Sequence, residues 1–61
     1  MKVYVIEQHE YNEDTNLYDI CNGSVEVFAD KGDTERFIDQ LSDLDREEGY
    51  DYAYFIRTFE L

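Results

Sequence analysis

The residue types that this sequence has least of already exclude several kinds of protein. It contains one cysteine, Cys21, one histidine, His9, and neither proline nor tryptophan. A single cysteine excludes an intrachain disulfide, and a lone thiol is typical of a reducing compartment, so we expect a cytoplasmic protein. No apolar run approaches the roughly 20 residues that a membrane span needs, so we expect no membrane segment.

Positive charge is also scarce. The chain carries five Lys and Arg against 16 Asp and Glu, which gives a formal net charge of −11. Such a charge repels nucleic acids and anionic membranes, and it attracts basic surfaces. The five basic residues are scattered along the chain, whereas direct nucleic-acid binding depends on clustered contacts to phosphates. The composition therefore predicts a protein partner with a basic surface and argues against direct binding of DNA or RNA.

The few chemically reactive side chains do not form a catalytic motif. His9 and Cys21 are a conceivable base and nucleophile, but nothing in the sequence supplies an oxyanion site beside them. We interpret them as a surface imidazole and a small hydrophobic residue. Pairs of carboxylates need an apolar cleft to separate their pKa values, and a chain of 61 residues leaves little room for one. We therefore predict a protein that is not an enzyme.

Metal and cofactor motifs are missing too. The segment from Asp30 to Glu35 places oxygen ligands near Gly32, but the glycine is third in it, whereas a calcium loop needs glycine at its sixth position. One cysteine and one histidine are too few for a structural zinc site, and there is no glycine-rich phosphate loop. We predict that the chain binds no metal and no cofactor.

What the sequence does contain is enough apolar material for one small folded domain. The hydrophobic fraction is 43% and the aromatic fraction 16%, which argues against disorder. We expect a single acidic domain over residues 1–61 with a thin core, because a chain this short buries only about 60% of its unfolded surface.

Three extended segments are predicted before the middle of the chain. Lys2 to Gln8 is rich in β-branched and aromatic residues on both alternating sets, which predicts a central strand covered at least partly on both faces. A polar loop from Glu10 to Asn16 leads into a strand from Leu17 to Cys21. Asn22-Gly23 then predicts either a tight hairpin into Ser24 to Phe28, which we favour slightly, or a single bent strand with a bulge at Gly23.

The second half of the chain predicts a helix and a final strand. Phe37, Ile38, Leu41 and Leu44 recur with helical spacing, so we expect a helix from about Thr34 to about Glu47. Asp33 is the expected N-cap, and Gly49 lies where helices end.

The last strand, Tyr50 to Leu61, should lie beside the first and antiparallel to it. The fold class is therefore α+β: a small antiparallel sheet of three or four strands with one helix packed on one face.

Two surface features are candidates for binding. The first is the acidic face of the helix and its flanks, formed by Asp33, Glu35, Asp39, Asp43, Asp45, Glu47, Glu48 and Asp51. The second is a group of tyrosines, of which Tyr4, Tyr18, Tyr52 and Tyr54 are the candidates for a partner or dimer interface. Tyrosine is enriched in interfaces, and we expect these side chains to line the helix-free face of the sheet, either as an interface or simply as its covering.

The opening residues MKVYVIEQHEY, with Val27-Phe28 and the helix around Phe37-Ile38-Leu41, resemble a family of short, uncharacterised bacterial and phage proteins. Members open with a KVYVLEHEY-like strand and continue with a polar loop, a strand ending in VF or VY, a helix and a final strand. The chain departs from this pattern at Asn22-Gly23. The resemblance implies a strand, strand, helix, strand fold and a bacterial or phage source, and it implies no activity and no functional residues.

Two hypotheses about function follow from these features. The first is an inhibitor from a phage or mobile element that acts against host defence, like anti-CRISPR and antirestriction proteins. Its acidic surface would mimic nucleic acid and block the nucleic-acid-binding site of a defence nuclease in the bacterial cytoplasm. The second is a small regulatory or accessory module, possible as a homodimer, that uses a tyrosine-rich sheet face. Salt should separate them, because contacts between charges weaken as ionic strength rises.

Overall fold

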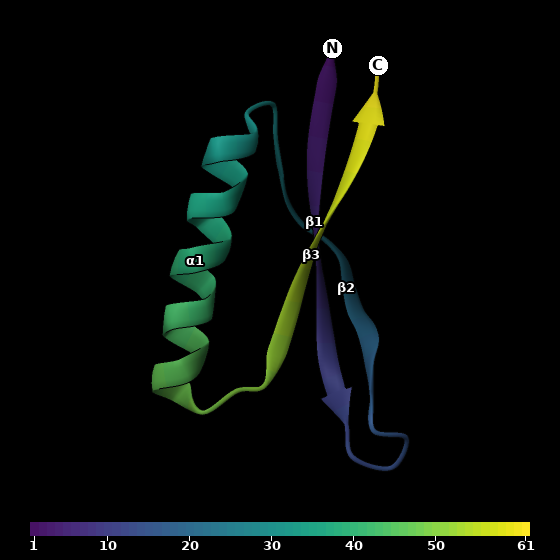
Figure 1. The fold of residues 1–61 in the computed structure, drawn as a ribbon, viewed down its shortest axis with the longest axis vertical. Coiled ribbons are helices and arrows are strands. Elements are labelled where there is room, and N and C mark those ends of the chain that lie inside the picture. Colours follow the sequence, from purple (N-terminus) through teal and green to yellow (C-terminus); the bar gives the residue numbers. More distant parts are fainter.

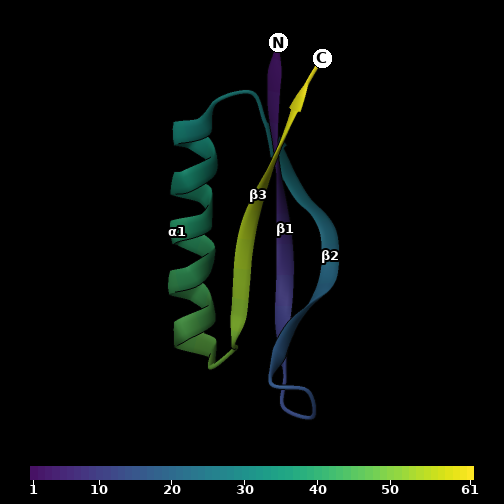
Figure 2. The same ribbon diagram turned by 45° about the vertical axis from the view of Figure 1, so that its right-hand side comes forward.

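Three strands and one helix make up the fold, and the computed structural model describes all residues 1–61. In chain order the elements are β1 (Lys2–Asn12), β2 (Leu17–Phe28), α1 (Lys31–Glu48) and β3 (Tyr52–Glu60). The sheet order is β2-β1-β3 with antiparallel neighbours, so the predicted class is confirmed, with three strands (Figure 2). α1 runs along one side of the sheet, and no element covers the other side (Figure 1).

β1 is the central strand, as its apolar sequence predicts. Its pairing with β3 is regular from Lys2↔Glu60 to Glu10↔Tyr52. The last strand therefore lies beside the first and antiparallel to it, as predicted. The two chain ends also meet, because the Leu61 N–H donates to the Met1 carbonyl at 2.7 Å.

A short polar turn at residues 13–16 joins β1 to β2; it lies within the predicted loop of residues 10–16, but the first three residues of that loop belong to β1 instead. The Asp14 N–H donates to Asn12 Oδ1 at 2.9 Å, and the Asn16 N–H donates to the Asn12 carbonyl at 2.8 Å. Asn16 has a φ of 59°, a left-handed conformation that asparagine tolerates better than most residues. Side chains that bond their own backbone thus close this hairpin.

The hairpin favoured at Asn22-Gly23 is wrong, and the alternative of one irregular strand is confirmed. Ile6 pairs with Glu26 and Gln8 pairs with Asn22, so three residues of β2 lie opposite the single residue Glu7. A type I′ turn needs positive φ at both central residues, and neither Asn22 nor Gly23 has one. The Ser24 N–H instead donates to Asn22 Oδ1 at 3.1 Å within the bulge. Pairing with β1 on both sides of the bulge outweighs the local turn preference.

α1 begins three residues earlier than predicted. Asp30 is extended, with φ −117° and ψ 127°, and its carboxylate accepts the Asp33 N–H at 2.9 Å, so Asp30 is the N-cap and the prediction of Asp33 is wrong. Asp33 lies in the first turn, where its charge favours the helix dipole. The end of the helix is as predicted: Gly49 has a φ of 80°, and its N–H donates to the Asp45 carbonyl.

The core lies between α1 and one face of the sheet, and it is thin. Ile6 is the one hydrophobic residue that is fully buried, and Thr34 is the other fully buried side chain. Phe28 and Phe37 join β2 to α1, with ring centroids 5.4 Å apart. Leu44, assigned to the apolar helix face from its spacing, is 55% exposed instead.

The molecule is elongated for its length. The radius of gyration of the Cα atoms is 12.4 Å, against about 10.5 Å expected for a compact domain of this size. Its principal extents are 39 × 24 × 12 Å. A single helix on a long, narrow sheet leaves much of the sheet uncovered.

Candidate functional site

The strand pairing decides which side chains face α1 and which do not. The Tyr54 hydroxyl donates to Asp45 Oδ2 of α1 at 2.5 Å, so Tyr54 and its cross-strand neighbour Gln8 face the helix. Neighbouring residues along a strand point to opposite faces. The open face, meaning the side of the sheet away from α1, is therefore formed by Val3, Val5, Glu7, His9, Tyr11, Tyr18, Ile20, Val27, Phe55, Arg57 and Phe59.

Large apolar side chains of the open face are exposed to solvent. The exposed fraction is 47% for Val27, 51% for Phe55 and 61% for Ile20. Scattered exposed hydrophobic residues are ordinary, but these share one face of one sheet with Phe59 and Tyr18, which are also exposed. Several exposed apolar side chains on one face of one sheet are typical of an interaction site.

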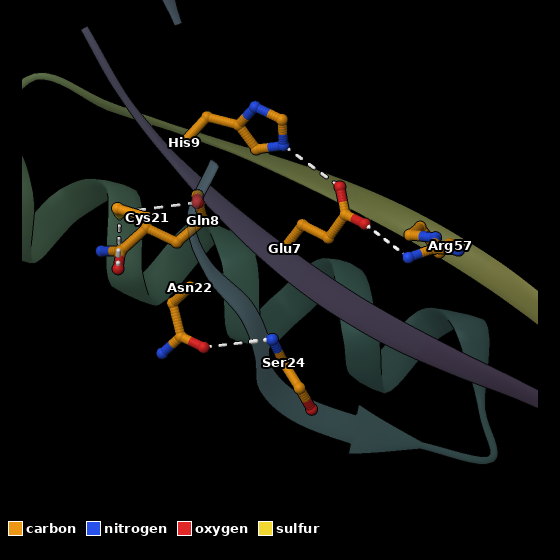
Figure 3. A network of polar contacts seen from close by, with 7 residues as sticks. All are labelled: Glu7, Gln8, His9, Cys21, Asn22, Ser24 and Arg57. Atoms are coloured by element: carbon orange, nitrogen blue, oxygen red, sulfur yellow. Dashed lines mark hydrogen bonds and ion pairs between the residues drawn. The ribbon is translucent and has the colours of Figure 1, made fainter. Parts of the chain in front are cut away.

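A paired carboxylate lies at the centre of this face. Glu7 is only 7% exposed. Its Oε1 is 3.1 Å from His9 Nε2, and its Oε2 is 3.1 Å from Arg57 Nη1 (Figure 3). The Phe55 ring lies edge-on to His9, with centroids 4.5 Å apart, and the Arg57 guanidinium lies 5.1 Å from the centroid of Phe59. Polar and aromatic groups thus hold one another in place.

This arrangement keeps Glu7 ionised despite its burial. The hydrogen bond from His9 is the largest influence, and together with the bond and charge of Arg57 it lowers the pKa of Glu7 against the opposing effect of desolvation. A buried charge without partners would be costly. No side-chain polar atom that is already buried lacks a partner, so the Glu7 carboxylate can be covered without leaving either oxygen unsatisfied.

The predicted acidic residues do not form one uniform surface. Asp33 pairs with Arg36 and Asp43 with Arg46, three residues apart on α1. Asp45 accepts from Tyr54, and Asp51 accepts from the Tyr18 hydroxyl at 2.8 Å. The remaining four form no ion pair or side-chain hydrogen bond and project their full charge: Glu35, Asp39, Glu47 and Glu48.

Negative charge is instead concentrated at one end of the molecule. The hairpin end, meaning residues 10–19 and 43–51, holds nine of the 16 carboxylates and one basic residue, Arg46. Both segments lie at the lower end in Figure 1. Glu10 and Asp19 are directly opposite each other across β1 and β2, an arrangement that is unfavourable for like charges. Of the other four basic residues, Arg57 lies at the centre of the open face, and Lys2, Lys31 and Arg36 lie toward the opposite end.

The tyrosine prediction needs a correction. Tyr54 bonds to α1, and Tyr4 and Tyr52 lie on the same face of the sheet as Tyr54, so these three face the helix and not the open side. Tyr18 is the one member of the predicted set on the open face, where its ring lies 5.3 Å from that of Tyr11. The open face is aromatic, but mainly through phenylalanine.

Sequence reasoning missed the residues that define the open face. Both alternating sets of the last strand are apolar, so the pattern alone does not say which set faces the helix. A signal did exist: Glu7 and Arg57 each interrupt an apolar strand with a charge. His9 and Cys21 form no nucleophile–base pair, because His9 bonds Glu7 while the Cys21 thiol donates to Gln8.

Compared with protein-family models, curated proteins and solved structures, the chain matches none of them. Its one helix is too polar to cross a lipid bilayer. The geometry of the chain itself therefore carries the functional argument.

Proposed function

We propose that this chain is a non-enzymatic protein-binding module and that the open face is its binding surface. The observation that carries the proposal is an exposed apolar face built around a carboxylate, Glu7, whose two oxygens are paired with His9 and Arg57. A partner that covers this face gains apolar burial without leaving the Glu7 charge unpaired.

The composition of the face supports the same function. Aromatic residues and arginine are enriched in protein interfaces, whereas lysine is depleted. The open face holds Phe55, Phe59 and Arg57 and contains no lysine. The register between β1 and β3 is also fixed, because the two strands pair without interruption. These features favour a preformed docking surface.

Two lysine substitutions with the same change in charge test the proposal. Val27→Lys places a charge on the open face, and Leu44→Lys places one on α1 at a site of similar exposure, 55% against 47%. Each tagged variant is co-expressed with the untagged chain in bacteria, and the proteins that it retains are identified. We expect Leu44→Lys to retain the same proteins as the wild type. We expect Val27→Lys to lose these proteins. Equal retention by all three would refute the open face as the binding surface.

A second candidate is favoured by the charge at the hairpin end. Nine carboxylates with one arginine form a surface suited to lysines and arginines that normally bind phosphates. The corresponding function is an inhibitor of phage or mobile-element origin that blocks the nucleic-acid-binding site of a bacterial defence nuclease by mimicry.

Charge reversal at unpaired carboxylates distinguishes this candidate. Glu47→Lys with Glu48→Lys removes two carboxylates of the hairpin end that no basic side chain of the chain itself neutralises. Mimicry predicts that a nucleic-acid enzyme is captured at low salt, released at high salt and lost in the double variant. Capture that survives both salt and charge reversal would exclude mimicry and leave the open face as the contact.

A further inference from the structure

We infer that the occupant of the open face is a second copy of this chain, stacked face to face with its long axis reversed. The resulting dimer has four layers, with the two sheets inside and the two helices outside. This inference rests on the proposed function of the open face and names its partner.

The first argument is that the isolated chain lacks a complete core. One hydrophobic residue, Ile6, is fully buried, and the accessible surface is 4499 Å², against about 4,200 Å² for a compact monomer of this mass. Domains of this size usually gain stability from disulfides, metals or association. Cys21 is the sole cysteine, and no group of three metal-ligating side chains exists. A partner present wherever the chain is made, namely another copy, supplies the missing cover.

The second argument is the distribution of charge. A net charge of −11 opposes self-association unless the carboxylates stay apart. At the centre of the open face, Glu7 and Arg57 cancel, and the carboxylates of α1 lie on the other side of the sheet. Face-to-face stacking therefore keeps both acidic helices at the outside of the dimer, where solvent screens them.

Charge also selects the antiparallel orientation. A parallel stack would bring together two hairpin ends with nine carboxylates each. An antiparallel stack instead places each hairpin end near the opposite end of the other copy, which is less acidic and holds Lys2, Lys31 and Arg36. The orientation thus keeps the two most acidic ends of the dimer apart.

The strand register then predicts specific contacts. Glu7 is at the middle of β1 and pairs with Phe55. The two-fold axis therefore lies between the two sheets at the level of this pair and runs across the strands. Val27 lies opposite Val5 on one side of this point, and Ile20 lies opposite His9 on the other. With β2 above β2, Val27 of one copy meets Ile20 of the partner subunit, which buries two of the exposed apolar side chains together.

The size of the face sets the expected affinity. Three strands about 4.8 Å apart and nine residues long cover roughly 430 Å² per copy. Two such faces bury roughly 860 Å² in total, which is below the range of standard specific interfaces, so we expect a weak, transient dimer with a dissociation constant no tighter than micromolar.

Sedimentation over micromolar to millimolar concentrations tests the inference. The wild type and Leu44→Lys should change from monomer to dimer over the same concentration range. Val27→Lys should weaken dimerisation at least tenfold. Ile20→Lys, on the other side of the two-fold axis, should have the same effect. Circular dichroism checks that each variant folds. A dimer that tolerates both lysines would overturn the inference, since it would form elsewhere, for example along the edge of β3.

Cysteine cross-linking tests the orientation. In a Cys21→Ser background, Val27→Cys chains mixed with Ile20→Cys chains should form mixed disulfides, whereas each alone should not. No mixed disulfide would contradict the antiparallel stack. A wild type that stays monomeric while it captures another protein that Val27→Lys does not capture would refute the dimer and leave the proposed function standing. If the wild type forms no dimer and Val27→Lys loses no captured protein, both the dimer and the proposed function are wrong.

Discussion

At the scale of single residues, Tyr54 joins the sheet to the helix. Burial, and then the hydrogen bond to Asp45, raises the pKa of Tyr54 to about 12, above the ordinary value near 10. Folding therefore favours the protonated hydroxyl. Its contribution to stability is complete below the unfolded pKa and is lost as pH rises from there toward 12.

Replacing this hydroxyl should change both stability and its dependence on pH. Tyr54→Phe removes the bond to Asp45, and we expect it to lower the free energy of unfolding near pH 7 by about 1 kcal/mol. It should also reduce the loss of stability at alkaline pH. Thermal unfolding followed at several pH values measures both effects. Tyr50→Phe is the matched control, because Tyr50 is 57% exposed and its hydroxyl forms no hydrogen bond. A Tyr54→Phe protein that behaves like the control would contradict the role of the contact.

Glu7 gives a prediction of the opposite sign. Its pKa is lowered in the fold, mainly by His9, so its contribution to stability is present at neutral pH and is lost as pH falls through the lowered pKa. Glu7→Gln should therefore be less stable than the wild type at neutral pH, with a smaller difference in acid. Unfolding curves across the acidic range measure this, with Glu48→Gln as a control without partners. A constant difference at all pH values would show that the Glu7 charge is not what matters.

At the scale of elements, two glycines have different roles. Gly49 ends α1 with a φ of 80°, whereas Gly23 in the β2 bulge has no positive φ and open space around its Cα. Gly49→Ala should cost about 1 kcal/mol because alanine disfavours this conformation. That corresponds to a fall of roughly 4 to 8 °C in Tm for a domain of this size.

Gly23→Ala is the matched substitution, and its Tm should stay within about 2 °C of the wild type, since the added methyl meets no atom within 4 Å. A large loss at Gly23 would mean that the bulge depends on glycine after all.

The elements also show how far sequence patterns reach. β1 and α1 are predictable because their apolar periodicities extend over many residues. Asn22-Gly23 misleads because its turn preference is local, whereas the pairing of Val27 and Glu26 with β1 involves residues far apart in sequence. The Asp30 cap is missed because two aspartates three residues apart have the same capping chemistry.

The candidate site was less predictable than the fold. The acidic residues are visible in the sequence, but the ion pairs of Asp33 and Asp43 depend on helix rotamers. The meeting of Glu7 with Arg57 requires the register between β1 and β3. Tyr4, Tyr52 and Tyr54 were placed on the wrong face because both faces of those strands carry apolar side chains.

At the scale of the whole molecule, one side of the sheet is covered and the other is not. The covered side contains the core, and the open face carries exposed Val27, Ile20 and Phe55 around a paired Glu7. Charge is uneven along the long axis as well, with carboxylates gathered at the hairpin end. Both asymmetries disappear when two chains stack antiparallel through their open faces.

The most direct test of this account follows methyl groups by NMR as the protein is diluted. Ile20 and Val27 report on the open face, Ile38 on a half-buried position of α1 and Leu44 on the exposed surface of α1. The account predicts that the Ile20 and Val27 signals shift with concentration in the micromolar to millimolar range while those of Ile38 and Leu44 stay constant. Unchanged Ile20 and Val27 signals up to millimolar concentration, or shifts confined to Leu44, would contradict it.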